Sequence, residues 1–125
     1  MPKIPEWTKD LGLLVMRVSI GSMMIAEHGL PKLLSFSERM SRFPDPLGVG
    51  SPASLTLAVV GEVFASAFLV LGLGTRIAAV PFVVTMLVAA LIVHAGDPLH
   101  DRELALMYAT SGLALLLLGP GRFSL

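Results

Sequence analysis

Four long apolar stretches, separated by short polar connections, dominate the pattern along this chain. They cover residues of about 11–30, 52–73, 77–94 and 99–118. Each is close to the roughly 20 residues that an α-helix needs to cross a hydrocarbon core of about 30 Å. A helix in a soluble bundle carries one polar face, but "LTLAVVGEVFASAFLVLGLG" and "IAAVPFVVTMLVAALIVH" carry none. The pattern therefore predicts an all-α membrane protein, a bundle of four transmembrane helices.

The connections between these stretches predict where the helices end. Gly29 and Pro31 are expected to stop the first helix, and Gly72 is expected to stop the second. The longest connection, residues 32–51, begins with "KLLSFSERMSRF", in which apolar and polar residues alternate. This predicts a short amphipathic surface segment between helices 1 and 2. Because neither a repeat nor an interdomain linker is visible, we expect one membrane domain over residues 1–125.

The first apolar stretch does not have the features of a cleavable signal peptide. It contains Arg17, and no small-x-small cleavage site follows it. We therefore expect a multi-pass protein of the cell membrane, surrounded by the lipid bilayer. Four crossings place both termini at one membrane face, side A, and the first and third connections at the other face, side B. Lys and Arg near the helix ends are equally frequent on the two sides, so the positive-inside rule leaves the orientation open.

Composition narrows the classes of function. Hydrophobic residues make up 54% of the chain and charged residues 14%, whereas about 25% of residues are charged in a soluble protein. Nine basic and nine acidic residues give a formal net charge of zero, which excludes a basic surface for nucleic acid. The absence of cysteine excludes disulfides, thiolate metal sites and Cys-x-x-Cys redox chemistry. The chain also carries no flavin or dinucleotide motif.

Arg17 and Glu62 fall deep inside predicted membrane spans, where ionisable groups are costly and indicate function by default. Glu62 is expected about 15 Å below side B, counting from Pro52 at 1.5 Å per residue. Arg17 of the first helix is expected at nearly the same depth. We therefore predict an Arg17–Glu62 ion pair near the middle of the membrane. Such a pair either locks two helices together or lines a polar cavity.

All three histidines of the chain are expected toward side B. His28 ends the first apolar stretch and His94 ends the third, so the two should lie at similar depth. Glu27 precedes His28 directly, and His100 and Glu103 follow His94 along the chain. One interpretation is that helix ends and loops are simply where polar residues occur. The other is a site that both histidines help to build.

Three chemistries suit such a site. Imidazole and carboxylate groups can shuttle protons to a quinone head group, because histidine titrates near neutral pH. His28 and His94 can instead ligate a haem iron from opposite sides. A transition metal held by histidines with Glu62 or Glu103 is the weakest candidate, because the Glu-x-x-His pairs of di-iron bundles are absent. We therefore expect no metal other than the iron of a haem.

Several segments, taken in order, resemble a known family. They are "LLVMRVSIG", "EHGLPKL", "GEVFASAFLVLGLGTRIAAV" and "HAGDPLHDRELALMYATSGLALLLLGPGRFSL". The most specific features are His-Gly-x-x-Lys at the end of the first helix, the glutamate of the second helix followed by a Gly-x-x-x-Arg turn, and the C-terminal "GPGRFSL". Over nearly the whole chain, this order and spacing resemble the DoxX family of small four-helix membrane proteins.

The resemblance implies a role in membrane redox chemistry. The DoxX family is similar to the small subunit of a thiosulfate:quinone oxidoreductase, and its members are linked to membrane redox complexes and to oxidative stress. The resemblance therefore implies that this chain is a redox-associated membrane subunit. By position, the resemblance assigns functional roles to Arg17, His28, Lys32, Glu62, Arg76, His94 and Glu103.

We therefore expect a subunit of a quinone-linked oxidoreductase with a polar pocket that opens to side B. Carboxylates and histidines of this pocket are the catalytic candidates, and cations bind the cofactor or an anionic substrate. The catalytic candidates are His28, Glu62, His94 and Glu103, and the binding candidates are Arg17, Lys32 and Arg76. The electrons must come from a bound cofactor, from a partner protein or from the substrate itself.

Two alternatives remain open at this stage. One is a non-enzymatic membrane scaffold that recruits soluble redox enzymes or assembles as a homo-oligomer. The amphipathic connection supports it, as do the small residues of the second helix, which favour close helix packing. These are Ala58, Gly61, Ala65 and Gly72. The other alternative is a haem-binding membrane protein with two axial histidines.

Overall fold

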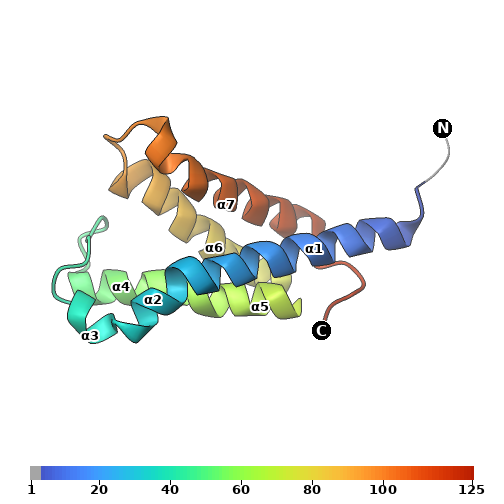
Figure 1. The fold of residues 1–125 in the computed structure, drawn as a ribbon, viewed down its shortest axis with the longest axis horizontal. Helices are drawn as coiled ribbons and strands as arrows, with labels where there is room; N and C mark the ends of the chain where they lie inside the picture. The colour runs from blue at the N-terminus through green and yellow to red at the C-terminus, as the bar shows by residue number, and fades with distance from the viewer. Residues whose placement is uncertain (1–3) are drawn as a thin grey trace.

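The computed structural model describes residues 4–125, and for Asp101 it describes the backbone alone. The fold is all-helical, with 76% helix and no strand in the described residues, which confirms the predicted class. Figure 1 shows the helices in space. They are α1 (Glu6–Met24), η1 (Ile25–Gly29), α2 (Leu30–Leu34), α3 (Phe36–Arg39), α4 (Ser51–Val59), η2 (Val60–Phe64), α5 (Ala65–Leu71), α6 (Thr75–Val88), η3 (Ala89–Val93) and α7 (Leu99–Leu118), where η marks a π-helical turn.

Successive elements join into helices long enough to cross a membrane. Three such helices occur in the described residues: Glu6–Leu34 with 29 residues, Ser51–Leu71 with 21 and Thr75–Val93 with 19. Only 22%, 44% and 33% of their most apolar windows are buried inside the molecule. The rest of this apolar surface needs an apolar surrounding, which a lipid bilayer supplies. Helix α7 packs along α6, and its role as a fourth membrane span stays a prediction.

The first helix is longer than the sequence pattern predicted. It begins at Glu6 and continues through Gly29 and Pro31 to Leu34, so the predicted stop near residue 30 is wrong. Gly29 has helical dihedral angles, and Pro31 lies in the first turn of α2, where its missing N–H is tolerated. The glycine is needed for packing instead. A Cβ atom on Gly29 would lie 2.8 Å from the carbonyl oxygen of Glu62.

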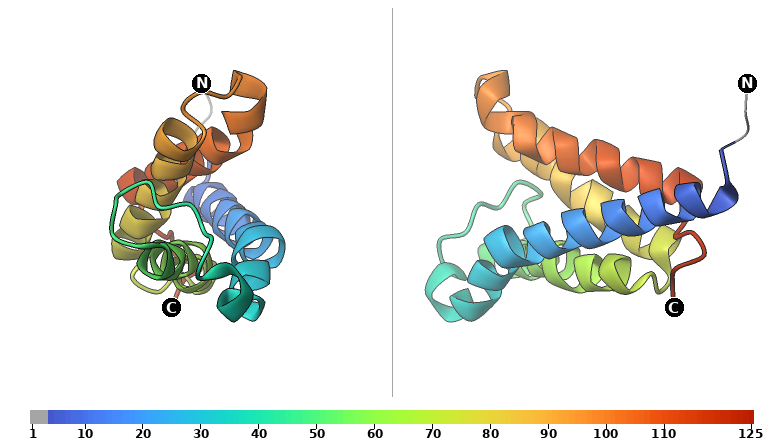
Figure 2. Two further views of the ribbon diagram at one scale, coloured as in Figure 1. Left: turned by 90° about the vertical axis from the view of Figure 1, so that its left-hand side faces the viewer. Right: turned by 45° about the vertical axis from the view of Figure 1, so that its right-hand side comes forward.

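The helices form two arms that cross and then separate. In the first arm, α1 packs on α5, which continues α4 and η2. In the second arm, α6 packs on α7. The two arms meet where α6 contacts α5 and η2, and α6 makes little contact with α4. At the crossing, a Cβ atom on Gly61 would lie 2.0 Å from the Thr85 hydroxyl oxygen. Toward side B the arms diverge, and the loop of residues 40–50 crosses the opening (Figures 1 and 2).

The apolar core lies where the two arms meet. Its buried members come from α1, α5, α6 and α7, and include Leu13, Met24, Leu69, Phe82 and Leu115. In lipid there is no hydrophobic drive that brings helices together, so close packing must hold them. Glycines provide that closeness at the helix contacts.

The C-terminal "GPGRFSL" segment lies beneath the side A ends of the helices (Figure 1). The backbone N–H of Arg122 donates to the Asp10 carboxylate at 3.1 Å, and that of Leu125 donates to the Leu71 carbonyl at 3.1 Å. Gly119 and Gly121 have φ values of +80° and +81°, which only glycine adopts readily. The glycines of this motif therefore shape a return of the chain under the bundle.

Candidate functional site

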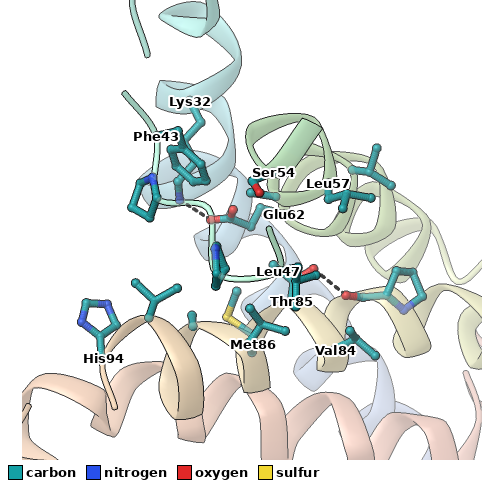
Figure 3. Close-up of a pocket in the computed structure, with 18 residues that line it drawn as sticks. Lys32, Phe43, Leu47, Ser54, Leu57, Glu62, Val84, Thr85, Met86 and His94 are labelled. Carbon is teal, nitrogen blue, oxygen red and sulfur yellow. Dashed lines mark hydrogen bonds and ion pairs between the residues drawn. The ribbon is translucent and has the colours of Figure 1, made fainter. Parts of the chain in front are cut away.

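A cavity of about 430 Å³ lies where the two arms separate. Helices α2, α4 and α6, the turns η2 and η3, and the loop of residues 40–50 enclose it (Figure 3). Most of its lining is apolar. The polar side chains among the lining residues are Lys32, Ser54, Glu62, Thr85 and His94. A mainly apolar cavity with a few polar groups is the usual form of a small-molecule site.

An ion pair forms one wall of the cavity. The Lys32 ammonium lies 2.5 Å from Oε1 of Glu62. The side chains are 19% and 4% exposed, respectively, so both charges are largely shielded from solvent. Removing two charges from water is costly, and only close pairing offsets that cost. Lys32 can reach Glu62 because the first helix continues past Pro31 and carries the lysine along the second helix.

The predicted Arg17–Glu62 pair is wrong. Arg17 is fully buried and donates through Nη1 to the carbonyls of Leu69 and Val70, at 3.1 and 3.2 Å, and through Nη2 to the carbonyl of Phe123. Those carbonyls belong to the last turn of α5 and to the C-terminal segment, about two helical turns beyond Glu62. Arg17 therefore satisfies a helix C-terminus, whose partial negative charge favours a cation.

His94 lies on the other side of the cavity from the ion pair (Figure 3). It directly follows η3, and its Nδ1 lies 2.8 Å from Oδ2 of Asp97. The carboxylate fixes the orientation of the ring and leaves Nε2 free to contact a ligand. Both side chains are partly exposed, at 43% and 47%. The cavity thus has a histidine opposite a lysine–glutamate pair.

Three π-helical turns surround this region, and the sequence pattern gave no signal for them. His28 lies in η1 and Glu62 in η2, and His94 closes η3 by donating its N–H to the Ala89 carbonyl at 3.0 Å. A π-turn widens the helix locally and is frequent at functional sites. Each of the three long helices therefore departs from regular α geometry where it carries a candidate residue.

The loop of residues 40–50 closes the side B end of the cavity with apolar side chains. Phe43 and Leu47 belong to its lining. Asp45 holds the loop by accepting hydrogen bonds from the Ser54 hydroxyl at 2.7 Å and from the Gly50 N–H at 2.8 Å. The Ser54 hydroxyl, and next the Gly50 N–H, lower the pKa of the Asp45 carboxyl from its ordinary value. The carboxylate thus ties the loop to the start of α4.

The remaining candidates lie outside this cavity. The His28 ring packs edge-on against Tyr108 of α7, with ring centroids 5.8 Å apart. Glu103 is exposed on α7. Arg76 lies at the side A end, where it donates to the Leu117 carbonyl at 3.4 Å. The expected pocket therefore contains Glu62 and His94 of its four catalytic candidates, together with Lys32. A haem between His28 and His94 stays a prediction.

Comparisons with known proteins support the resemblance seen in the sequence. No curated protein and no solved structure matches the chain in these comparisons. The sequence model of the DoxX family matches residues 12–95. That range holds most of the first long apolar helix, the whole of the second and third, and every residue that lines the cavity, whereas Glu103 and the "GPGRFSL" segment lie beyond it. The chain belongs to the DoxX family.

Proposed function

We propose that the cavity binds the head group of a membrane quinone and handles the protons of its redox reaction. The observation that carries this proposal is the position of the Lys32–Glu62 pair and His94 on opposite sides of a mainly apolar cavity. A quinone has the matching chemistry: a flat apolar ring with a carbonyl oxygen at each end. The volume of about 430 Å³ suits a ligand of this size.

The reduction of a quinone to a quinol adds two electrons and two protons, one proton to each carbonyl oxygen. The Lys32 ammonium can donate a hydrogen bond to one oxygen and stabilise the charge that develops on it. Glu62, paired with that ammonium, can take up the proton that replaces the one transferred. The His94 imidazole, oriented by Asp97, can serve the other oxygen.

The electrons require a donor outside these residues. The chain has no cysteine and no flavin or dinucleotide motif. We therefore place it as a redox-associated subunit that acts with a soluble redox enzyme or accepts electrons from a substrate such as thiosulfate. The partner would approach from side B, where His94 and the loop of residues 40–50 lie.

Equilibrium binding tests this proposal directly. Purified protein in lipid nanodiscs is titrated with a decyl-tailed benzoquinone, and His94→Ala is compared with His100→Ala. His100 is exposed and does not line the cavity, so it is a matched control. Loss of one hydrogen bond to a carbonyl should weaken binding about tenfold in His94→Ala. His100→Ala should bind like the wild type.

Wild-type protein that does not bind the quinone would overturn the proposal. Equal affinities in both variants would remove His94 from the site. An intense Soret band in the purified protein would favour haem. A quinone-independent function that survives His94→Ala, together with capture of a stable redox enzyme, would favour the scaffold.

A further inference from the structure

Part of the cavity wall is also part of the outer surface of the bundle. Leu57, Val60 and Val84 line the cavity, and they are 52%, 41% and 52% exposed. Leu57 and Val60 belong to the second long helix, and Val84 belongs to the third. Both helices are apolar enough to cross a membrane. The wall between them therefore meets hydrocarbon rather than water.

The helices leave a gap at this wall. The two helices approach closely at Gly61, where a Cβ atom would lie 2.0 Å from the hydroxyl oxygen and 2.9 Å from the Cβ atom of Thr85. Beyond this point α6 makes little contact with α4. The divergence of the two arms is visible in Figure 1. The crossing at Gly61 and Thr85 thus bounds the gap toward side A, and the loop of residues 40–50 covers the gap toward side B.

The polar groups of the cavity lie away from this gap, apart from the hydroxyls of Ser54 and Thr85, which already donate to Asp45 and to the Pro81 carbonyl. In Figure 3, Leu57 and Val84 lie across from each other at one end of the cavity, and Lys32 and His94 lie across from each other toward the other end. The cavity is therefore polar at one end and apolar at the other. A ligand with a polar carbonyl head and a hydrocarbon tail fits both ends at once, whereas a small water-soluble anion fits only one.

We infer that the gap bounded by Leu57, Val60 and Val84 is a lateral portal, through which a quinone reaches the cavity from the bilayer while its tail stays between α4 and α6. This inference rests on the proposed function and specifies its ligand as a tailed, membrane-dissolved quinone. The tail passes from one apolar surrounding into another, so its contribution to specificity comes from close packing against α4 and α6 and not from the removal of apolar surface from water.

A tryptophan at position 84 tests the portal. Its ring would occupy the gap where the tail passes. Val80→Trp is the matched control, because Val80 is one turn earlier on α6, is 49% exposed and does not line the cavity. Two probes are titrated into nanodiscs: a decyl-tailed benzoquinone, and the same ring without a tail. Leu57→Trp is a second variant on the opposite edge, for the case in which Val84→Trp does not fold.

Val84→Trp should weaken binding of the tailed probe about tenfold or more and leave the tail-less probe unchanged, whereas Val80→Trp should change neither. Equal effects of Val84→Trp and Val80→Trp would overturn the portal. Equal loss of both probes in Val84→Trp would also overturn it, since the tryptophan would then be blocking the head-group site. In either case wild-type binding of both probes would leave the proposed function standing. Wild-type protein that binds neither probe would overturn both.

Discussion

Single residues decide how this bundle keeps charge inside an apolar surrounding. Arg17 and Glu62 are both almost completely buried, and each is stabilised in a different way. Arg17 uses backbone carbonyls of a helix end and of the C-terminal segment. Glu62 uses one ammonium, that of Lys32. Arg17 thus has several partners that no single substitution removes, whereas Glu62 depends on one side chain.

Removal of Lys32 should therefore cost more than an ordinary surface substitution. Lys32→Met leaves the Glu62 carboxylate buried without a counter-ion, and such losses cost about 3–5 kcal/mol. We expect the free energy of unfolding, measured by denaturant titration in detergent micelles, to fall by about that amount. Lys32→Met combined with Glu62→Gln should recover most of the loss, because no charge is left unpaired. A double variant as unstable as the single one would contradict this account.

At the scale of elements, the loop of residues 40–50 depends on one carboxylate. Asp45 accepts hydrogen bonds from Ser54 and Gly50, and these hold its pKa below the ordinary value. A carboxyl group with a lowered pKa in the folded state contributes stability above its ordinary pKa. That contribution is lost as the pH falls through the lowered pKa. The covering of the cavity should therefore loosen in acid.

Hydrogen exchange of the loop amides measures this effect. The Val49 and Gly50 amides donate to the Asp45 carboxylate, at 3.0 and 2.8 Å. We expect both amides to be protected near neutral pH and to lose protection in acid, after correction for the intrinsic exchange rate. In Asp45→Asn this pH-dependent step should disappear, because the amide side chain does not titrate in that range. A step that persists in Asp45→Asn would assign the pH dependence to another group.

Hydropathy predicted the long helices, because length and apolar character alone decide whether a helix can cross a bilayer. It did not predict which charges meet. A count of 1.5 Å per residue along ideal helices predicted that Arg17 and Glu62 lie at the same depth. The first helix, however, begins earlier than predicted, and it crosses the second helix at a different depth. Gly29 and Pro31 suggested a helix end in the sequence, yet the glycine serves close packing. Lys32 was therefore expected at the surface and not beside Glu62.

For the whole molecule, the number of membrane crossings determines where the ends lie. If α7 crosses as well, the N-terminal and C-terminal segments share one face, opposite the loop of residues 40–50. Because the chain has no cysteine, single-cysteine variants report this without background. The variants are treated, in sealed vesicles, with a maleimide that cannot cross the membrane. The cysteines of Ser37→Cys and Gly96→Cys should react from one face of the membrane, and those of Thr8→Cys and Arg122→Cys from the other face. Labelling of position 122 together with 37 and 96 would show that α7 does not cross.

The three π-turns have a consequence for insertions and deletions in the chain. A π-turn closes its hydrogen bond one residue later than an α-turn, so each of these helices carries one surplus residue near the cavity. Deletion of Val60, at the start of η2, would let the helix close as a regular α-helix. The flanking helices α4 and α5 would keep their orientation relative to each other, because the surplus residue is absorbed within the π-turn, and only the residues of η2 would shift. This span can therefore lose one residue inside η2 without misaligning α4 and α5, whereas a one-residue deletion within α5 would rotate all that follows by about 100°.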